Sequence, residues 1–327
     1  MNQVEVVGLG ALNLDHLHRV KRILIDGETV VKETISSPGG SAANTVYGLA
    51  KLRVKTGVAG VVGDDAEGKV LIQDFQRVGV DTSQIRVKPG VKTGSVLCLS
   101  DRLGRRSLYV IPGANNLLTM GDLDLTYINQ ARILHLSSFA DDRQFKMLLE
   151  LMGGLSTRLS FAPGALYASR GLKALSPILS KTYILFINRD EIKQLTGEDI
   201  ISGAQSCLKQ GCSIVVVTLG KGVKLELGKE TGHKTVTATC YIRDAESEHT
   251  IQPGNRDIVS QADTTGAGDA FAAGFLYGLL KGKGLEECGR LGDITARFSI
   301  TKLGTRQGFP TPNQLAQRYR ELYSGQL

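Results

Sequence analysis

Short apolar segments alternate with amphipathic segments along most of the chain, and this alternation constrains the fold more than any other feature of the sequence. The apolar runs have the length of buried strands and lie at 4–10, 133–136, 183–187 and 214–217. Hydrophobic residues recur with helical spacing in the segments 41–52, 65–78, 142–152 and 204–210. Strands that are apolar on both faces and joined by helices are typical of α/β proteins. We therefore predict an α/β fold of three layers, with a mostly parallel central sheet between helices.

Two stretches rich in β-branched residues depart from this alternation because no helix separates their strands. They are 28–36 and 93–112, and the second contains a hairpin-turn sequence at 101–104. We predict that they form a small β lid, built from about residues 11–36 and 90–113, on a single domain spanning 1–327. The edges of such a lid could also pair with a second subunit, which would give a homodimer.

Composition narrows the environment and the partners of the chain. Hydrophobic residues make up 42% and charged residues 22%, and no apolar run is long enough for a membrane helix. The N-terminus has no signal-like segment, and the five cysteines form no C-x-x-C pair, so we expect a cytoplasmic protein with free thiols. The formal charge of +7 is spread out without a basic, aromatic stripe, which favours a small anion such as a nucleotide over nucleic acid.

The segment Asp263–Phe271, with the sequence DTTGAGDAF, carries the clearest chemical signal. Gly266, Ala267 and Gly268 would leave backbone N–H groups accessible at the start of an apolar helix, where an anion is favoured. Asp269 follows at once and has two interpretations. It stabilises the helix N-terminus, or it accepts a proton from an attacking hydroxyl beside a bound phosphate. Spacing alone supports the two interpretations equally.

Five segments in the same order along the chain resemble the motifs of the ribokinase-like (PfkB) carbohydrate kinase family. They are Pro38–Thr45 (PGGSAANT), Gly60–Gly68 (GVVGDDAEG), Asn188–Glu191 (NRDE), Thr218–Gly222 (TLGKG) and Asp263–Phe271. The TLGKG segment resembles the family's nucleotide-contacting loop and is one residue shorter between its glycines than in some members. One glycine-rich loop would be weak evidence, whereas five ordered motifs over nearly the whole chain are specific.

The resemblance implies an ATP-dependent kinase that phosphorylates a hydroxyl group. Asp269 would be the general base, and Gly266, Ala267 and Gly268 would form an anion hole with it. Asn188 and Glu191 would organise Mg²⁺ near the phosphates of ATP, although Asn-x-x-Glu alone indicates a helix cap with a capping box. The remaining implied contacts are Thr218, Gly220 and Gly222 along the nucleotide, Asp293 near the purine, and Asp263 and Thr265 around a monovalent cation such as K⁺.

The acceptor site implied by the resemblance lies near the N-terminus of the chain. Asn13, Asp15, Gly39, Gly40 and Asn44 would bind the hydroxyls of a small-molecule sugar or nucleoside, and short polar side chains suit such contacts. The alternative for Asn13 and Asp15 is that they cap a turn. The turn at 39–44 contains no lysine, which favours an uncharged acceptor.

Two departures from the family pattern leave the acceptor open. Ser137, Ser138 and Phe139 stand where sugar kinases of the family often have a glutamate, and 161–165 lacks the D-P-N-type turn. We favour a sugar kinase of the ribokinase or fructokinase type, with a nucleoside kinase of the same fold as the alternative. A non-catalytic relative would not need Asp269. A Rossmann-type dehydrogenase is excluded because Gly8 and Gly10 lack the third glycine of that fingerprint.

Overall fold

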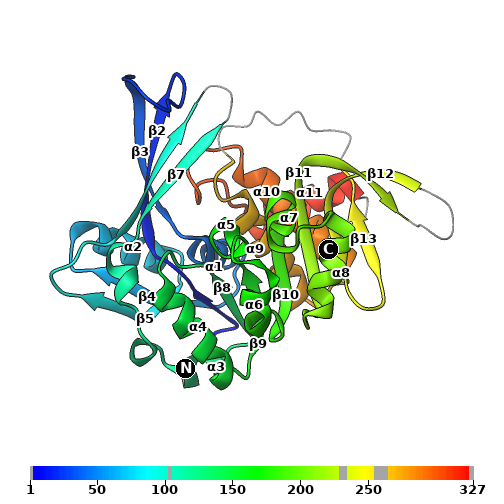
Figure 1. Ribbon diagram of the computed structural model, residues 1–327, viewed down its shortest axis with the longest axis horizontal. Coiled ribbons are helices and arrows are strands. Elements are labelled where there is room, and N and C mark those ends of the chain that lie inside the picture. The colour runs from blue at the N-terminus through cyan, green and yellow to red at the C-terminus, as the bar shows by residue number, and fades with distance from the viewer. Residues whose placement is uncertain (1–2, 102–104, 228–233, 254–263, 324–327) are drawn as a thin grey trace.

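A computed structural model describes residues 3–101, 105–227, 234–253 and 264–323, and it contains a large and a small β-sheet (Figure 1). The large sheet has nine strands in the order β13-β12-β11-β10-β9-β8-β1-β4-β5. Its strands are β1 (Val6–Leu9), β4 (Thr56–Gly63), β5 (Asp81–Lys88), β8 (Ile133–Ser137), β9 (Arg158–Ala162), β10 (Thr182–Asn188), β11 (Ile214–Leu227), β12 (Lys234–Arg243) and β13 (Glu248–Ile251). All its neighbours pair in parallel except β11 with β12 and β12 with β13. The prediction of a mostly parallel sheet is confirmed.

Helices cover both faces of this sheet because successive strand residues point to opposite sides. In β1, Val7 packs into one apolar core and Val6 into the other, and both are fully buried. The first core is covered by α3 (Leu125–Gln130), α4 (Asp142–Gly154), α5 (Gly164–Ala168), α6 (Gly171–Leu179), α7 (Arg189–Thr196) and α8 (Ile200–Lys209). The second is covered by α1 (Ser41–Lys51), α2 (Ala66–Arg77), α9 (Ala267–Leu280) and α10 (Leu285–Ser299), with α11 (Pro312–Tyr323) packed on α10. The three predicted layers are therefore present.

The small sheet has the strand order β3-β2-β6-β7 and projects from the main body (Figure 1). Its strands are β2 (Asn13–Val20), β3 (Val31–Gly39), β6 (Gly94–Ser100) and β7 (Arg106–Ile111). β3, β6 and β7 come from the two β-rich stretches that the sequence sets apart, whereas β2 lies before the first of them, within the predicted lid range 11–36. β6 and β7 pair as the predicted antiparallel hairpin. Most of the predicted turn at 101–104 lies outside the described residues.

The segment after the apolar part of β11 differs from its prediction. The TLGKG motif was expected to form a loop, but β11 continues through it to Leu227. The pairing with β12 shifts between Thr218 and Val223, so the motif is a bulge inside a strand. The polar stretch 243–255 contains β13, which pairs with β12 and extends the sheet.

No helix in the described part of the chain is long and apolar enough to cross a membrane. All five cysteines are buried free thiols, as their scattered spacing indicates.

Candidate active site

The turn before α9 presents a helix N-terminus that is open to a ligand. Gly266 has a left-handed backbone (φ 78°), and a Cβ there would lie 3.2 Å from the Thr305 side chain and backbone, so glycine is required. A Cβ on Gly268, by contrast, would meet no atom within 4 Å. The first N–H groups of a helix have no partner within the helix, and its dipole favours negative charge. This geometry suits the anion hole predicted at 266–269.

Asp269 points across to α1 instead of capping its own helix. Its Oδ1 accepts a hydrogen bond from the Ser41 hydroxyl at 2.7 Å, and its Oδ2 accepts one from the Asn44 amide at 2.8 Å. The Thr45 hydroxyl also donates to the Asp269 backbone carbonyl at 3.3 Å. The N-cap of α9 is Gly266, and no side chain caps that helix. Asp269 thus lies in the first turn of α9 without capping it by a hydrogen bond, and its carboxylate is held by two donors from α1.

Protein surrounds Asp269 except toward a cavity, and this environment perturbs its acidity. Burial raises the pKa of Asp269 to about 6, although the hydrogen bonds from Asn44 and Ser41 and the nearby Arg306 charge act in the opposite direction. The charge of Glu191 adds to the increase. A carboxylate with a pKa near 6 is ionised at neutral pH and is a stronger base than an exposed aspartate.

A cavity of about 110 Å³ connects Asp269 with the predicted nucleotide residues. It is lined by Ser41, Thr45, His135, Ala162, Gly164, Phe186, Ile187, Asn188, Glu191, Thr218, Gly268, Asp269 and Ala272. Burial lowers the pKa of His135 to about 3, so this imidazole is neutral and is not a base at neutral pH. The other polar side chains of the lining are the carboxylates of Asp269 and Glu191, the Asn188 amide, and the hydroxyls of Ser41, Thr45 and Thr218.

Asn188 and Glu191 form a capping box at the start of α7. Asn188 Oδ1 accepts from the backbone N–H groups of Asp190 and Glu191, and Glu191 Oε2 accepts from the Asn188 N–H. The capping interpretation is thus correct, and it does not conflict with a role at the site because both residues also line the cavity. Burial raises the pKa of Glu191. A cation at this position would offset the cost of keeping that carboxylate ionised.

The other predicted nucleotide residues lie outside this cavity lining. Gly220 and Gly222 follow Thr218 in the bulge of β11, and a Cβ on Gly220 would meet no atom within 4 Å. Asp293 is buried on α10, where its Oδ2 forms an ion pair with Arg297 at 2.7 Å. Thr218 therefore lines the cavity itself, whereas Asp293 forms a largely buried ion pair within α10.

The predicted acceptor residues meet where the small sheet joins the body. Asp15 lies on β2 against Gly39 of β3, so closely that a Cβ on Gly39 would be 2.1 Å from Asp15 Oδ2. Gly40 is the N-cap of α1 and connects this pair to Asn44 in the first turn. Asn13 is buried, and its Oδ1 accepts from the Asn115 amide at 2.9 Å. Asp15, Gly39, Gly40 and Asn44 thus share one corner of the molecule, while Asn13 also supports Asn115.

The described part of the predicted monovalent-cation site is Thr265, since Asp263 lies outside the described residues. The Thr265 hydroxyl accepts a hydrogen bond from Arg106 Nη1 at 2.9 Å. Arg106 belongs to β7 of the small sheet, so a positively charged group of the lid contacts the turn that precedes the anion hole.

Arg306 is the main residue of the site that the sequence analysis missed. It lies between α10 and α11 and is only 4% exposed. It donates to Asn44 Oδ1 at 2.9 Å, to the Gly39 carbonyl at 3.1 Å and to Asp74 at 2.8 Å. The turn at 39–44 contains no lysine, but a cation from a segment more than 260 residues away lies beside it. A lone arginine in Gly304–Gly308 gives no local signal of this contact.

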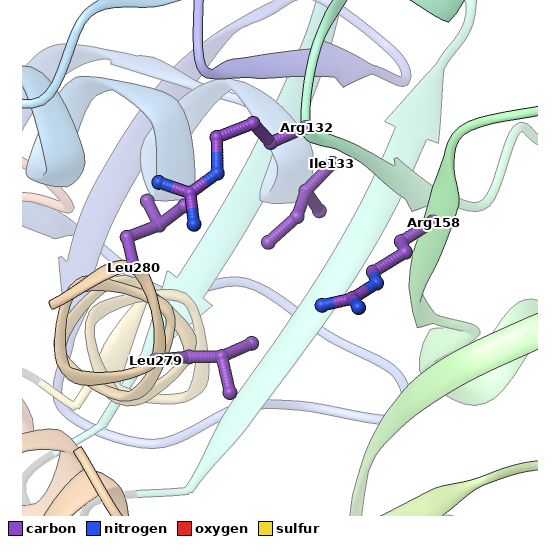
Figure 2. Close-up of a pocket in the computed structure, with 5 residues that line it drawn as sticks. All are labelled: Arg132, Ile133, Arg158, Leu279 and Leu280. Atoms are coloured by element: carbon purple, nitrogen blue, oxygen red, sulfur yellow. The ribbon is translucent and has the colours of Figure 1, made fainter. Parts of the chain in front are cut away.

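A second cleft, of about 310 Å³, lies at the far end of α9 between the starts of β8 and β9 (Figure 2). Arg132 and Arg158 point toward it, together with Leu279 and Leu280 from α9. Arg132 is paired with Glu5 at 3.3 Å, and the Arg158 guanidinium stacks 4.7 Å from the Tyr183 ring. Glu5 offsets the charge of Arg132, and no carboxylate is among the described residues that line the cleft.

Comparisons with known proteins agree with this geometry. The family described as pfkB family carbohydrate kinase matches residues 1–312. An uncharacterized sugar kinase from Archaeoglobus fulgidus is 37% identical over 80% of this chain and 98% of its own length. A cytidine kinase from Thermococcus kodakarensis is 31% identical over 92% of this chain and 98% of its own. The structure of Arabidopsis thaliana ribokinase complexed with ribose and ATP superposes with a TM-score of 0.78, at 24% identity, over 96% of this chain and 98% of that one.

The shared architecture is the ribokinase fold, and the family match gives the class, which is that of kinases that transfer phosphate from ATP to an alcohol group. The family match over nearly the whole chain then makes the identification: this protein belongs to the pfkB family of carbohydrate kinases. The resemblance drawn from the five motifs is confirmed.

We predict that Asp269→Asn lowers kcat by about 10²–10⁴-fold while ATP binding is retained, because a general base is lost. In the wild type, kcat should fall as the pH drops through about 6, where Asp269 takes up a proton. Steady-state rates and nucleotide titrations measure both effects. Asp124→Asn, which preserves an N-cap on α3, is the control and should leave kcat unchanged. A variant of Asp269 with more than about a tenth of wild-type kcat would contradict the role.

The same variant should be more stable than the wild type above pH 6. The folded state keeps the Asp269 proton up to about pH 6, whereas the unfolded chain releases it near 3.8, so stability is lost as the pH rises between these values. Asparagine carries no charge and avoids this cost. We expect the free energy of unfolding at pH 8 to rise by about 1–2 kcal/mol, which is less than the full pKa difference implies because the carboxylate keeps some solvent contact. Urea unfolding at pH 4 and pH 8 tests the difference.

Proposed function

We propose that this protein transfers the γ-phosphoryl group of ATP to a hydroxyl of a sugar, with Asp269 as the general base. The acceptor oxygen attacks the γ-phosphorus, the bond to the ADP oxygen breaks, and the hydroxyl proton passes to Asp269. The N–H groups at 266–269 stabilise the charge on the transferred group. The observation that carries the proposal is the buried Asp269 carboxylate beside an open helix N-terminus, with both oxygens oriented by α1.

The acceptor in this proposal is uncharged and binds at the corner formed by Asp15, Gly39, Gly40 and Asn44. Asp15 accepts hydrogen bonds from hydroxyls and repels a phosphorylated sugar. Arg306 does not offset this for a phosphate, because it is buried and donates to Asn44, Asp74 and the Gly39 carbonyl. A nucleoside is the second candidate, and the 31% identity to a cytidine kinase favours it.

The nucleotide in this proposal occupies the side of the cavity that contains Asn188, Glu191 and Thr218, and it extends along Gly220 and Gly222 toward Asp293. The described residues contain no group of three or more His, Cys, Asp or Glu that could hold a metal ion. This fits Mg²⁺, which is usually bound by one or two carboxylates, waters and the substrate phosphates. Glu191 and Asn188 would hold it through water, and the ion would neutralise charge on the phosphates.

We place the reaction in a single cytoplasmic kinase domain whose small sheet, about 11–36 and 90–113, covers the acceptor. The same sheet supports a homodimer. Its edge strand β7 exposes four consecutive apolar residues, Leu108, Tyr109, Val110 and Ile111, by 40–56% each. An exposed apolar edge strand has unpaired backbone groups that a second copy could satisfy.

We predict that an uncharged sugar is the best acceptor in an ADP-release assay with ribose, fructose, adenosine, cytidine and a sugar phosphate. Asp15→Ala should raise the acceptor KM by about 10- to 100-fold, the effect of losing a charged hydrogen-bond acceptor, with little change in the KM for ATP. Asp26→Ala, in the exposed loop before β3, is the control and should leave both KM values unchanged. An acceptor KM within a factor of about two of the wild type, or a sugar phosphate as best substrate, would refute the assignment.

We predict that EDTA abolishes turnover, that Mg²⁺ restores it, and that K⁺ increases the rate through a site formed by Asp263 and Thr265. The control cation is tetramethylammonium at equal ionic strength, because it cannot enter a small oxygen-lined site. Equal rates in the two salts would contradict the K⁺ site and leave the Arg106 guanidinium as the positive charge beside Thr265.

We predict a dimer in sedimentation-equilibrium experiments and a monomer for the double variant Leu108→Lys/Val110→Lys, because charges on the edge strand block pairing. Val70→Lys, on the exposed face of α2, introduces a charge at a similarly exposed apolar position and should stay dimeric. A monomeric wild type would refute the interface.

A further inference from the structure

Arg306 is the buried hub of a hydrogen-bonded network that ends at the proposed base. Its guanidinium lies 4.6 Å from the Phe75 ring and 5.1 Å from the Tyr47 ring, which hold it in place by stacking. Nη1 forms an ion pair with Asp74 of α2 at 2.8 Å, and Nη2 donates to the Gly39 carbonyl at 3.1 Å. Nε donates to Asn44 Oδ1 at 2.9 Å. The arginine thus joins α2, the acceptor turn and α1 at one point.

The contact with Asn44 fixes which end of that amide faces Asp269. A guanidinium only donates hydrogen bonds, so the carbonyl oxygen of the amide must face Arg306. The NH₂ end then points to Asp269 Oδ2, at 2.8 Å. An ionised carboxylate only accepts, so this orientation matches the ionised form of Asp269. Without Arg306 the amide could rotate by a half turn and present its oxygen, which matches only the protonated form.

We propose that Arg306 is a positioning residue for catalysis: it orients the Asn44 amide so that Asp269 is held ionised and aimed at the acceptor hydroxyl. The inference rests on the proposed role of Asp269 as the base. Because Arg306 also binds the Gly39 carbonyl, the same residue sets the acceptor turn relative to that base. Binding of ATP depends on β11 and α7, which Arg306 does not contact through these bonds.

The charges that face Asp269 set the direction of the expected pH effect. Ser41 and Asn44 of α1 are neutral donors, Glu191 of α7 is acidic, and Arg306 is the one basic group among the charges that affect Asp269 in the described structure. Loss of Arg306 removes both a favourable charge and the oriented NH₂ donor. Asp269 then takes up its proton at higher pH, so the acidic limb of the kcat profile moves upward in pH.

The test is Arg306→Met, which keeps most of the side-chain length and removes all donors. We expect kcat to fall by about 10- to 100-fold, as for a small misplacement of a reacting group. The KM for ATP should stay within about twofold, while the acidic limb of kcat moves to higher pH. In an Asn44→Ala background, Arg306→Met should add little, because the effect passes through Asn44.

Two further variants keep the test decisive. Arg306→Met/Asp74→Leu removes both charges of the buried pair, and if the single variant fails to fold, the same kinetic changes are expected in this one. Arg290→Met is the control, since Arg290 also pairs with a carboxylate, Glu286, and stacks on a ring, Tyr323, but is not among the charges that act on Asp269. It should leave kcat and its pH profile unchanged.

The outcomes separate this inference from the proposed function. If Asp269→Asn is inactive but Arg306→Met has wild-type kcat and pH profile, the positioning role is wrong and the base assignment stands. If Asp269→Asn retains activity, the base assignment itself fails. An Arg306→Met variant with a raised KM for ATP and an unchanged pH profile would show a purely structural role and would also overturn the inference.

Discussion

The N-termini of α1 and α9 meet at the carboxylate of Asp269, and the arrangement of the whole site depends on this meeting. Ser41 and Asn44 are more than 220 residues from Asp269 in sequence, yet both donate to it. The turn before each helix contributes a different part of the site. The turn before α1 carries the proposed acceptor residues, and the turn before α9 presents N–H groups suited to phosphate. Fixing the two helices together therefore fixes acceptor, base and phosphate relative to one another.

Several charged side chains are buried at this junction, and burying them costs free energy. Asp15, Asp74 and Asp269 all lie near Arg306, which is the buried cation that faces them in the described structure. A buried ion pair contributes little net stability, because desolvation offsets the attraction between the charges. The proposed role of Arg306 is instead to orient its neighbours. Each of its donors is directed to a different element, namely α1, α2 and the proposed acceptor turn.

Much of the fold was predictable because its signals are local. The strands 133–136, 183–187 and 214–217 are apolar on both sides, which only a covered parallel sheet satisfies. The bulge at Thr218–Gly222 and the strand β13 were missed, since both depend on pairing with β12. At the site, the family resemblance supplied Asp269, Asn188 and Glu191. Arg306 could not be found, because its partners Gly39, Asn44 and Asp74 are all distant in sequence.

The small sheet is connected to the chemistry at both of its ends. Asp15 and Gly39 lie where β2 and β3 join the body, on the acceptor side. Arg106, on β7, donates to Thr265, which immediately precedes Gly266 of the anion hole. A displacement of the sheet would therefore change both the proposed acceptor contacts and the turn before the proposed anion hole. In the proposed reaction, the small sheet would exclude water fully only when both contacts are in place, which favours transfer to the bound acceptor over transfer to water.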